Sequence, residues 1–187
     1  LLAALGNDEL ADGTRIELYG PMGLDRFLDH WHRLYRGTVS GMGFIETNEV
    51  RGGTVFEAGP SLVRAAEVRH GEIPALAYRL QDDTGSIVYT GDTGYDDLLV
   101  DFARGADLLV AECSFPDGHE ASGHLTPALV GRLLAESGAG RGLLVHLYPE
   151  QFRNPSSAEM VMASVRRHFR GPVEIADDGM EIGIERN

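Results

Sequence analysis

From Ile87 onward, three apolar runs are each followed by a residue that can bind a metal ion or move a proton. The runs and the residues that follow them are Ile87-Val88-Tyr89 with Asp92, Leu108-Leu109-Val110-Ala111 with Glu112, and Leu143-Leu144-Val145 with His146. A continuous apolar run closed by a polar residue is typical of a buried strand that delivers a side chain to its C-terminal end. The pattern therefore predicts strands over 87–90, 107–111 and 142–147, with chemistry at their ends.

Between these runs the apolar positions recur every three to four residues, which predicts helices. The predicted helices are 95–104, 126–137 and 156–169. The turn Asp177-Asp178-Gly179 predicts a hairpin-like end over 173–184. The first half predicts an amphipathic helix over 24–35 and strands over 15–19, 44–51, 54–57, 62–69 and 75–80. The chain begins with several strands and continues with alternating strands and helices. This order predicts one layered α/β domain over 1–187, with helices on the outer face.

Charge and composition narrow the range of possible functions. The chain has 29 acidic and 16 basic residues, a formal charge of −13, and every one of those basic residues is arginine. An acidic chain repels phosphate backbones at long range, so tight binding of a large nucleic acid is disfavoured, although a local basic patch could override that average. The single cysteine, Cys113, excludes an internal disulfide. No run approaches the roughly 18 to 20 apolar residues that span a bilayer, so we expect a cytoplasmic protein without membrane contact.

Asp92 and His146 are the first two candidate site residues, and each has a structural alternative. Asp92 follows a strand and Gly91, where its carboxylate could bridge two cations. It could equally cap a helix starting near Tyr95. His146 is followed by Pro149, which ends the strand. A histidine after an apolar run is as often a core residue as a ligand, so both interpretations stay open.

His124, His70 and Glu112 complete the set. His124 lies just before Thr126 and Pro127, which predict the N-cap and first position of a helix. A histidine there can donate or take a proton near neutral pH, unless it is an exposed loop residue. His70 and Glu112 each stand where a predicted strand ends. Strand ends that converge on His, Asp, Glu and His are the layout of an α/β active site.

Motifs of other enzyme classes are absent from the sequence. It contains no Gly-x-Ser-x-Gly elbow, no Gly-x-x-x-x-Gly-Lys phosphate loop and no Gly-x-Gly-x-x-Gly after a strand. Cys113 has no evident electropositive setting, so a thiol nucleophile is not expected.

The order and spacing of several short segments resemble the metallo-β-lactamase superfamily, nearest its ribonuclease Z-like branch. Among these segments are Thr90-Gly91-Asp92-Thr93-Gly94, Glu112-Cys113-Ser114-Phe115, His124-Leu125-Thr126-Pro127 and His146-Leu147-Tyr148-Pro149. The resemblance extends from about residue 14 to residue 185, and 18–24 and 68–70 are further matching segments within it. It implies an αββα sandwich with a two-metal site between its sheets.

The resemblance also implies a role for each candidate residue. Asp92 would bridge two zinc ions, His70 would bind one and His146 the other; manganese or iron could replace zinc. A metal-bound hydroxide would attack the substrate, because a bound metal lowers the pKa of water from 15.7 to roughly 7. His124 would protonate the leaving group, and Glu112 would orient His124.

Two departures from that family matter. Its His-x-His-x-Asp-His motif, which supplies four metal ligands, does not occur in this sequence. Residues 1–5 resemble the start of the helix that normally follows the motif, so we expect the motif and the first strands to precede Leu1. The alternative is a remnant that cannot hold two metals alone. Second, nothing between Gly37 and Gly59 is long enough for the arm with which ribonuclease Z grips transfer RNA.

The sequence therefore predicts a zinc-dependent hydrolase of a small phosphodiester or ester, acting as a homodimer. The first alternative is transfer-RNA 3′ processing on the same scaffold. The second is a metal-free binding or assembly module that keeps the fold without the catalysis.

Overall fold

A computed structural model describes residues 15–34, 45–119, 123–149 and 156–184. The chain divides into two compact units, Leu1–Arg51 and Gly52–Asn187. The single domain expected over 1–187 stays a prediction, and the expectation for 1–5 lies outside the described residues.

The first unit is a strand–helix–strand element. Strand β1 (Ile16–Gly20) pairs in parallel with β2 (Ile45–Glu49), and helix α3 (Leu24–Leu34) lies between them in the sequence. Glu49 at the end of β2 accepts a hydrogen bond from the Gly23 amide at 2.7 Å, just before α3 begins. The predicted helix over 24–35 and strand over 15–19 are thus confirmed to within a residue.

The second unit contains a seven-stranded mixed sheet in the order β3-β4-β5-β6-β7-β8-β9, which follows the sequence. The first four strands are antiparallel: β3 (Val55–Ala58), β4 (Ser61–His70), β5 (Ile73–Gln81) and β6 (Ser86–Tyr89). The next three continue in parallel from β6: β7 (Leu108–Glu112), β8 (Arg141–Val145) and β9 (Val173–Ile175). The strands predicted from the apolar runs are confirmed.

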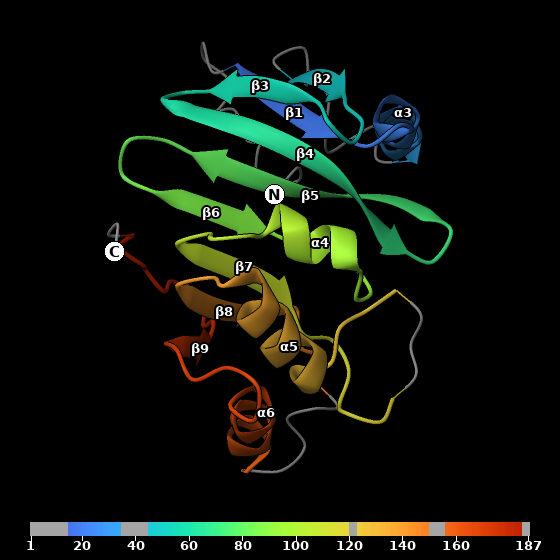
Figure 1. Ribbon diagram of the computed structural model, residues 1–187. Helices are drawn as coiled ribbons and strands as arrows, with labels where there is room; N and C mark the ends of the chain where they lie inside the picture. The colour runs from blue at the N-terminus through green and yellow to red at the C-terminus, as the bar shows by residue number, and fades with distance from the viewer. Residues whose placement is uncertain (1–14, 35–44, 120–122, 150–155, 185–187) are drawn as a thin grey trace. The chain divides into compact units, whose positions relative to one another are not determined.

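Three helices accompany the parallel half of the sheet: α4 (Asp97–Phe102), α5 (Pro127–Ser137) and α6 (Ser157–Val165). Figure 1 shows α4 and α5 in front of the sheet, on the same face. Val88, Leu109 and Leu144, one from each central strand, are fully buried in one apolar cluster with residues of these helices. In β7 the neighbouring residues Leu108 and Leu109, which point to opposite faces of the sheet, are both buried, and this explains why the strand reads as a continuous apolar run.

Two predictions at the C-terminal end need correction. The helix predicted over 156–169 ends at Val165, and a turn follows it. The hairpin expected over 173–184 is not formed: β9 pairs only with β8, and no second strand follows in the described residues up to 184. The turn itself forms, with Gly179 at φ 79° and the Met180 amide donating to the Asp177 carbonyl at 3.1 Å. Turn residues alone do not supply a partner strand.

None of the helices in the described part of the chain has the length and apolarity needed to cross a membrane.

Candidate active site

The parallel register of the sheet brings the predicted site residues to one edge. Strand β6 leads to Asp92 through the bend at Gly91, β7 ends at Glu112, and His146 follows β8 directly. Strand β4 runs in the same direction as β6, because two antiparallel pairings separate them, and it ends at His70. The carboxyl ends of these strands therefore share an edge, as the sequence predicted.

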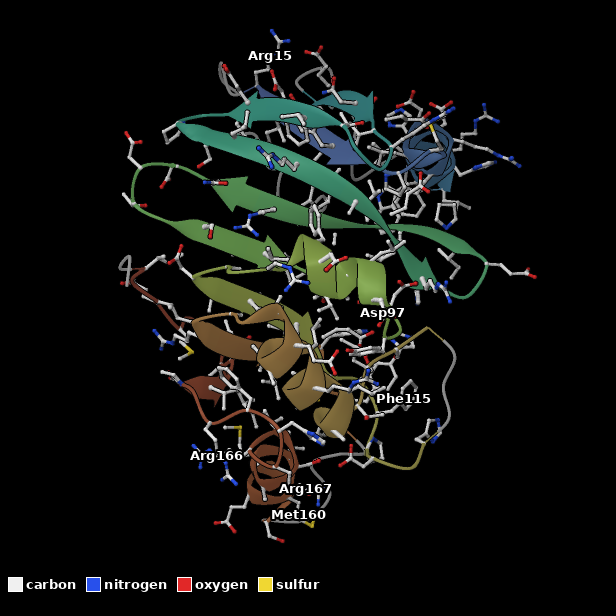
Figure 2. The ribbon with its side chains drawn as sticks, viewed as in Figure 1. Arg15, Asp97, Phe115, Met160, Arg166 and Arg167 are labelled. Atoms are coloured by element: carbon white, nitrogen blue, oxygen red, sulfur yellow. The ribbon has the colours of Figure 1, made fainter. Side chains whose placement is uncertain are left out.

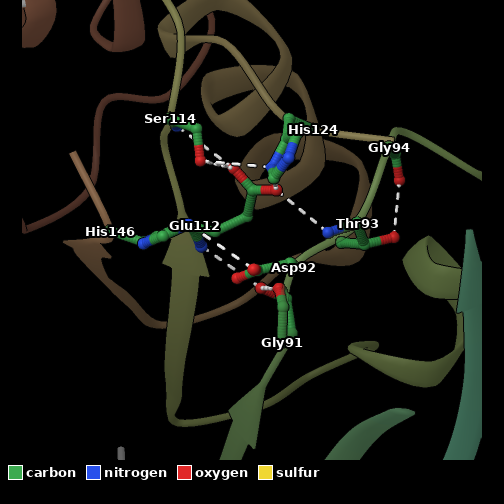
Figure 3. A network of polar contacts seen from close by, with 9 residues as sticks. Gly91, Asp92, Thr93, Gly94, Glu112, Ser114, His124 and His146 are labelled. Carbon is green, nitrogen blue, oxygen red and sulfur yellow. Dashed lines mark hydrogen bonds and ion pairs between the residues drawn. The ribbon is translucent and has the colours of Figure 1, made fainter. Parts of the chain in front are cut away.

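Glu112 is the centre of a buried polar network. Its side chain is 1% exposed, and its Oε1 lies 2.8 Å from His124 Nδ1. Oε1 also accepts from the Thr93 amide at 2.9 Å, while Oε2 accepts from the Ser114 amide and hydroxyl at 3.1 and 2.8 Å. Figure 3 shows these bonds around the carboxylate. The oxygens of an ionised carboxylate can only accept hydrogen bonds. The contact with Glu112 therefore requires a hydrogen on Nδ1 of His124, and it leaves Nε2 as the ring nitrogen that can bind or exchange a proton.

His124 is held in place from several sides. Its side chain is 14% exposed, which rules out the exposed loop alternative, and its ring meets that of His70 edge to face at 4.8 Å. Gly123 has φ 102°, and a Cβ there would lie 2.8 Å from the backbone nitrogen of Gly71. Only glycine lets this loop approach the turn after His70 so closely.

Asp92 and His146 form a second pair beside the first. Nε2 of His146 lies 3.4 Å from Oδ2 of Asp92, with both side chains more than a third exposed. The helix-cap alternative for Asp92 is wrong, because Asp96 caps α4 by accepting from the Leu98 amide at 2.8 Å. The core alternative for His146 is also wrong, since its side chain is 39% exposed.

His146 has an unusual backbone. Its φ is 54°, and it is the only residue other than glycine with positive φ in the part of the chain that the structure describes. The left-handed region costs an L-residue roughly 1–2 kcal/mol. Strain of this kind is common at functional sites, where the surrounding structure imposes it.

Aromatic side chains that the sequence analysis left without a role surround the two histidines. Phe115 stacks on His119 at 4.4 Å between ring centroids and meets His124 and Tyr148 edge to face at 5.4 and 4.9 Å. Tyr148 also meets His146, at 5.2 Å. Phe115 and Tyr148 follow β7 and β8, respectively, within four residues. That position after a site-bearing strand is the sequence signal that could have identified them as site residues.

Cys113 lies next to Glu112 but is fully buried. Burial raises the pKa of its thiol to about 12, and the nearby Glu112 carboxylate adds to this rise. The thiol is therefore protonated at neutral pH, in agreement with the absence of a thiol nucleophile expected from the sequence.

The donor atoms at this edge fit a divalent cation in kind and in spacing. Imidazole nitrogen and carboxylate oxygen are zinc ligands, and two ligands about 2.1 Å from a tetrahedral zinc lie roughly 3.4 Å apart. The Asp92–His146 separation of 3.4 Å matches that spacing. In the described ranges, however, no group of three or more His, Cys, Asp or Glu side chains is arranged to hold a metal ion. The residues present therefore fit part of a coordination shell.

A mixed sheet with a buried Glu112–His124 pair and an exposed Asp92–His146 pair at one edge places the chain among α/β proteins that gather polar donor atoms at the carboxyl ends of their strands. The chain belongs to the beta-lactamase superfamily, whose domain model matches residues 3–147. It is 39% identical over 125 residues to the probable metallo-hydrolase YhfI of Bacillus subtilis, covering 65% of this chain and 48% of YhfI. It is 34% identical over 102 residues to ribonuclease Z of Myxococcus xanthus, covering 52% and 32% respectively.

Solved structures agree with the fold. The crystal structure of the metallo-β-lactamase fold protein YhfI gives a TM-score of 0.73 at 26% identity, covering 92% of this chain and 66% of YhfI. Human tRNase Z, short form, gives 0.70 at 20% identity, covering 99% and 74%. The predicted metallo-β-lactamase-like α/β fold and its ribonuclease Z-like relatives are confirmed. The chain spans about half the length, or less, of the curated relatives it matches.

Proposed function

We propose that the protein is a metal-dependent hydrolase that acts on a small phosphodiester or ester. The family membership supports hydrolysis, since YhfI is named a probable metallo-hydrolase and other relatives are named ribonuclease Z. Among the structures of similar fold is a diphosphatase of the PhnP family, 19% identical to this chain. These names support a hydrolase, and the substrate class is part of the proposal.

One observation carries the proposal: two pairs with complementary chemistry lie side by side and are linked through the chain. The Asp92–His146 pair is exposed and suits a cation, whereas the Glu112–His124 pair is buried and suits proton transfer. Thr93, the neighbour of Asp92, donates its amide hydrogen to Glu112. The position of the acid–base pair is therefore set directly by the loop that carries the cation-binding carboxylate.

The proposed roles follow from that geometry. Asp92, His146 and His70 would hold part of the shell of one or two divalent cations, zinc in our proposal, with manganese or iron as alternatives. Such a cation would supply hydroxide at neutral pH, because binding to a metal lowers the pKa of water to roughly 7. Glu112 fixes the ring of His124 by accepting from Nδ1–H, and His124 acts as general acid in its doubly protonated form, giving the proton on Nε2 to the leaving group and returning to the neutral ring.

The test is hydrolysis of bis(p-nitrophenyl) phosphate by the protein, expressed with whatever residues its gene places before Leu1. Asp92→Ala and His146→Ala should each abolish turnover and lower bound zinc. Asp83→Ala and His168→Ala are matched controls, because both side chains are exposed and belong to neither pair. Near-normal turnover in Asp92→Ala or His146→Ala would sink the proposal.

The His124 role has its own test. His124→Ala should lower turnover by roughly 10²–10⁴-fold, the usual contribution of a general acid, while leaving the zinc content intact. Loss of metal in this variant contradicts the proton-donor role.

Transfer-RNA 3′ processing is the second candidate, and the ribonuclease Z relatives favour it. The net charge of −13 opposes it, because affinity for a phosphate backbone comes from basic side chains that neutralise phosphates and release their counterions. Cleavage of a precursor transfer RNA with steep salt dependence, faster than turnover of the small diester, would favour this candidate. Failure of the protein to bind zinc at all would instead favour the metal-free module.

We also propose that the protein is a cytoplasmic homodimer. Sedimentation of the purified protein measures its oligomeric state and tests the dimer.

A further inference from the structure

The loop after β7 runs beside the segment that carries His124 and leads into α5. Three contacts join the two stretches along their length. The Ser114 hydroxyl lies 3.3 Å from His124 Nδ1, the Phe115 amide donates to the Leu125 carbonyl at 3.4 Å, and Asp117 Oδ1 accepts from the Ala128 amide at 2.8 Å. The contact made by Asp117 is the outermost of the three.

Asp117 differs from the other two residues because it also reaches a second helix. Its Oδ2 accepts from the Ser164 hydroxyl and from an Arg167 guanidinium nitrogen, the latter at 3.1 Å. Arg167 in turn donates to the Ser164 hydroxyl at 2.6 Å. Arg167, labelled in Figure 2, lies in the turn that follows α6. One carboxylate therefore joins the loop after β7, the first turn of α5 and the end of α6.

Asp117 also performs the capping role that the sequence assigned to Thr126. Thr126 occupies the N-cap position of α5 and Pro127 the first helical position, but the Thr126 side chain makes no capping hydrogen bond. The Ala128 amide, one of the free donors of the first turn, is satisfied by Asp117 instead. A carboxylate at this end also suits the helix dipole.

We propose that Asp117 is a positioning residue for His124, an inference that rests on the proposed hydrolase function. Asp117 fixes where α5 begins, and α5 begins three residues after His124. Leu125, between them, is fully buried and leaves little slack in the connection. Through this short connection Asp117 sets the place of the His124 ring against Glu112 without touching the substrate.

The experiment combines two readouts on the same variants. The first is the proton NMR resonance of His124 Nδ1–H, assigned by its loss in His124→Ala, which reports on the bond to Glu112 whether or not the protein hydrolyses anything. The second is kcat and KM for bis(p-nitrophenyl) phosphate. The variants are Asp117→Ala, Asp117→Ser as a second variant should the first not fold, and Asp117→Asn as the conservative replacement that keeps an acceptor for Ala128.

Asp117→Ala and Asp117→Ser should broaden or lose the resonance through exchange with water and lower kcat by up to about a hundredfold, at unchanged KM and zinc content. Asp117→Asn should restore both readouts. The control Arg132→Ala, which removes a pair with Glu136 on the exposed side of α5, should leave both as in the wild type.

Several outcomes overturn the inference. A wild-type resonance and wild-type kcat in Asp117→Ala or Asp117→Ser would do so, as would equal losses in Arg132→Ala. An intact resonance with a raised KM alone would show that Asp117 acts on binding and not through His124. If the wild-type protein hydrolyses nothing, the proposed function fails, while the resonance still decides whether Asp117 positions the ring.

Discussion

Glu112 shows how one buried side chain can organise a site at the scale of single residues. Its two oxygens accept from Thr93, Ser114 and His124, so each oxygen faces at least two donors. In Glu112→Gln one oxygen becomes an N–H₂ group, which opposes those donors whichever way the amide turns.

Glu112→Gln should therefore lower the free energy of unfolding by about 1–3 kcal/mol, the cost of buried donors left without an acceptor. Urea unfolding measures this difference. Glu72→Gln, at an exposed position, is the matched control and should change stability little. Unchanged stability in Glu112→Gln would mean that the network contributes nothing to folding.

The backbone of His146 gives a second prediction at this scale. Glycine adopts φ near 54° without penalty, whereas alanine has the same cost as histidine. His146→Gly should therefore be more stable than His146→Ala by about 1 kcal/mol, the reverse of the usual order. Thermal unfolding of the two variants decides it, and a more stable alanine variant would refute the strain.

Much at the residue scale was predictable because it depends on strand ends. Apolar runs identified β6, β7 and β8, and the residues after them could only lie at one edge of a parallel sheet. The resemblance predicted that Glu112 orients His124, but the strained angle of His146 and the bonds from Thr93 and Ser114 to Glu112 were not predictable, because they depend on how separate loops meet. Asp96 and not Asp92 caps α4, a shift of one turn of chain, because sequence patterns locate a helix start only to within about 2–4 residues.

At the scale of elements, α5 and α6 cross with their backbones in close approach. A Cβ at Gly131, inside α5, would lie 2.5 Å from the Val165 carbonyl oxygen. At an exposed helix position, replacing glycine by alanine stabilises by about 1 kcal/mol. Gly131→Ala should instead destabilise, because the helices must move apart to admit the methyl group.

Chemical unfolding checks the sign of that change. Ala135→Gly, at an exposed position of α5, is the control and should cost about 1 kcal/mol through helix propensity alone. A more stable Gly131→Ala protein would show that the close approach is not maintained in solution.

The ties of Asp117 predict a pH dependence. Burial alone raises the pKa of this carboxyl, but the hydrogen bonds from Ser164, Ala128 and Thr126 and the charge of Arg167 outweigh burial and lower it. As the pH falls, the unfolded chain takes up this proton first, near pH 3.9, which favours unfolding. The stabilisation is therefore complete above that pH and is lost as the pH falls through the lower folded-state pKa.

The measurement is the difference in unfolding free energy between the wild type and Asp117→Asn, from pH 7 down to pH 3. The difference should be constant above about pH 5 and shrink below about pH 4. A difference that grows on acidification would contradict the assigned direction.

The helices and strands of this fold were more predictable than the contacts between them. Periodicity identified α5, and Thr126 and Pro127 marked its start. It could not show that Asp117, nine residues before Thr126, supplies the cap, because that contact depends on α6 packing against α5. The missing hairpin partner of β9 has the same cause: turn residues predict a local bend, whereas pairing depends on which strands are near.

At the scale of the whole molecule, the sheet and the family are well defined, but the metal shell is incomplete within the described residues. Asp92 and His146 have the spacing of two zinc ligands, and His70 lies against His124. Zinc usually has three or four protein ligands, so the sequence expectation of further histidines before Leu1 stays a prediction. The resemblance and not the periodicity provided that expectation, because no pattern within a chain reports residues outside it.

The most direct measurement of the central claim is turnover of bis(p-nitrophenyl) phosphate before metal removal, after removal with a chelator, and after zinc is returned. The protein should carry any residues that precede Leu1, and Asp92→Ala should be treated in parallel. We expect chelation to abolish turnover in the wild type and zinc to restore it, while Asp92→Ala stays inactive throughout. Turnover that survives complete metal removal, or that returns equally in Asp92→Ala, would contradict a metal-dependent hydrolase centred on this edge of the sheet.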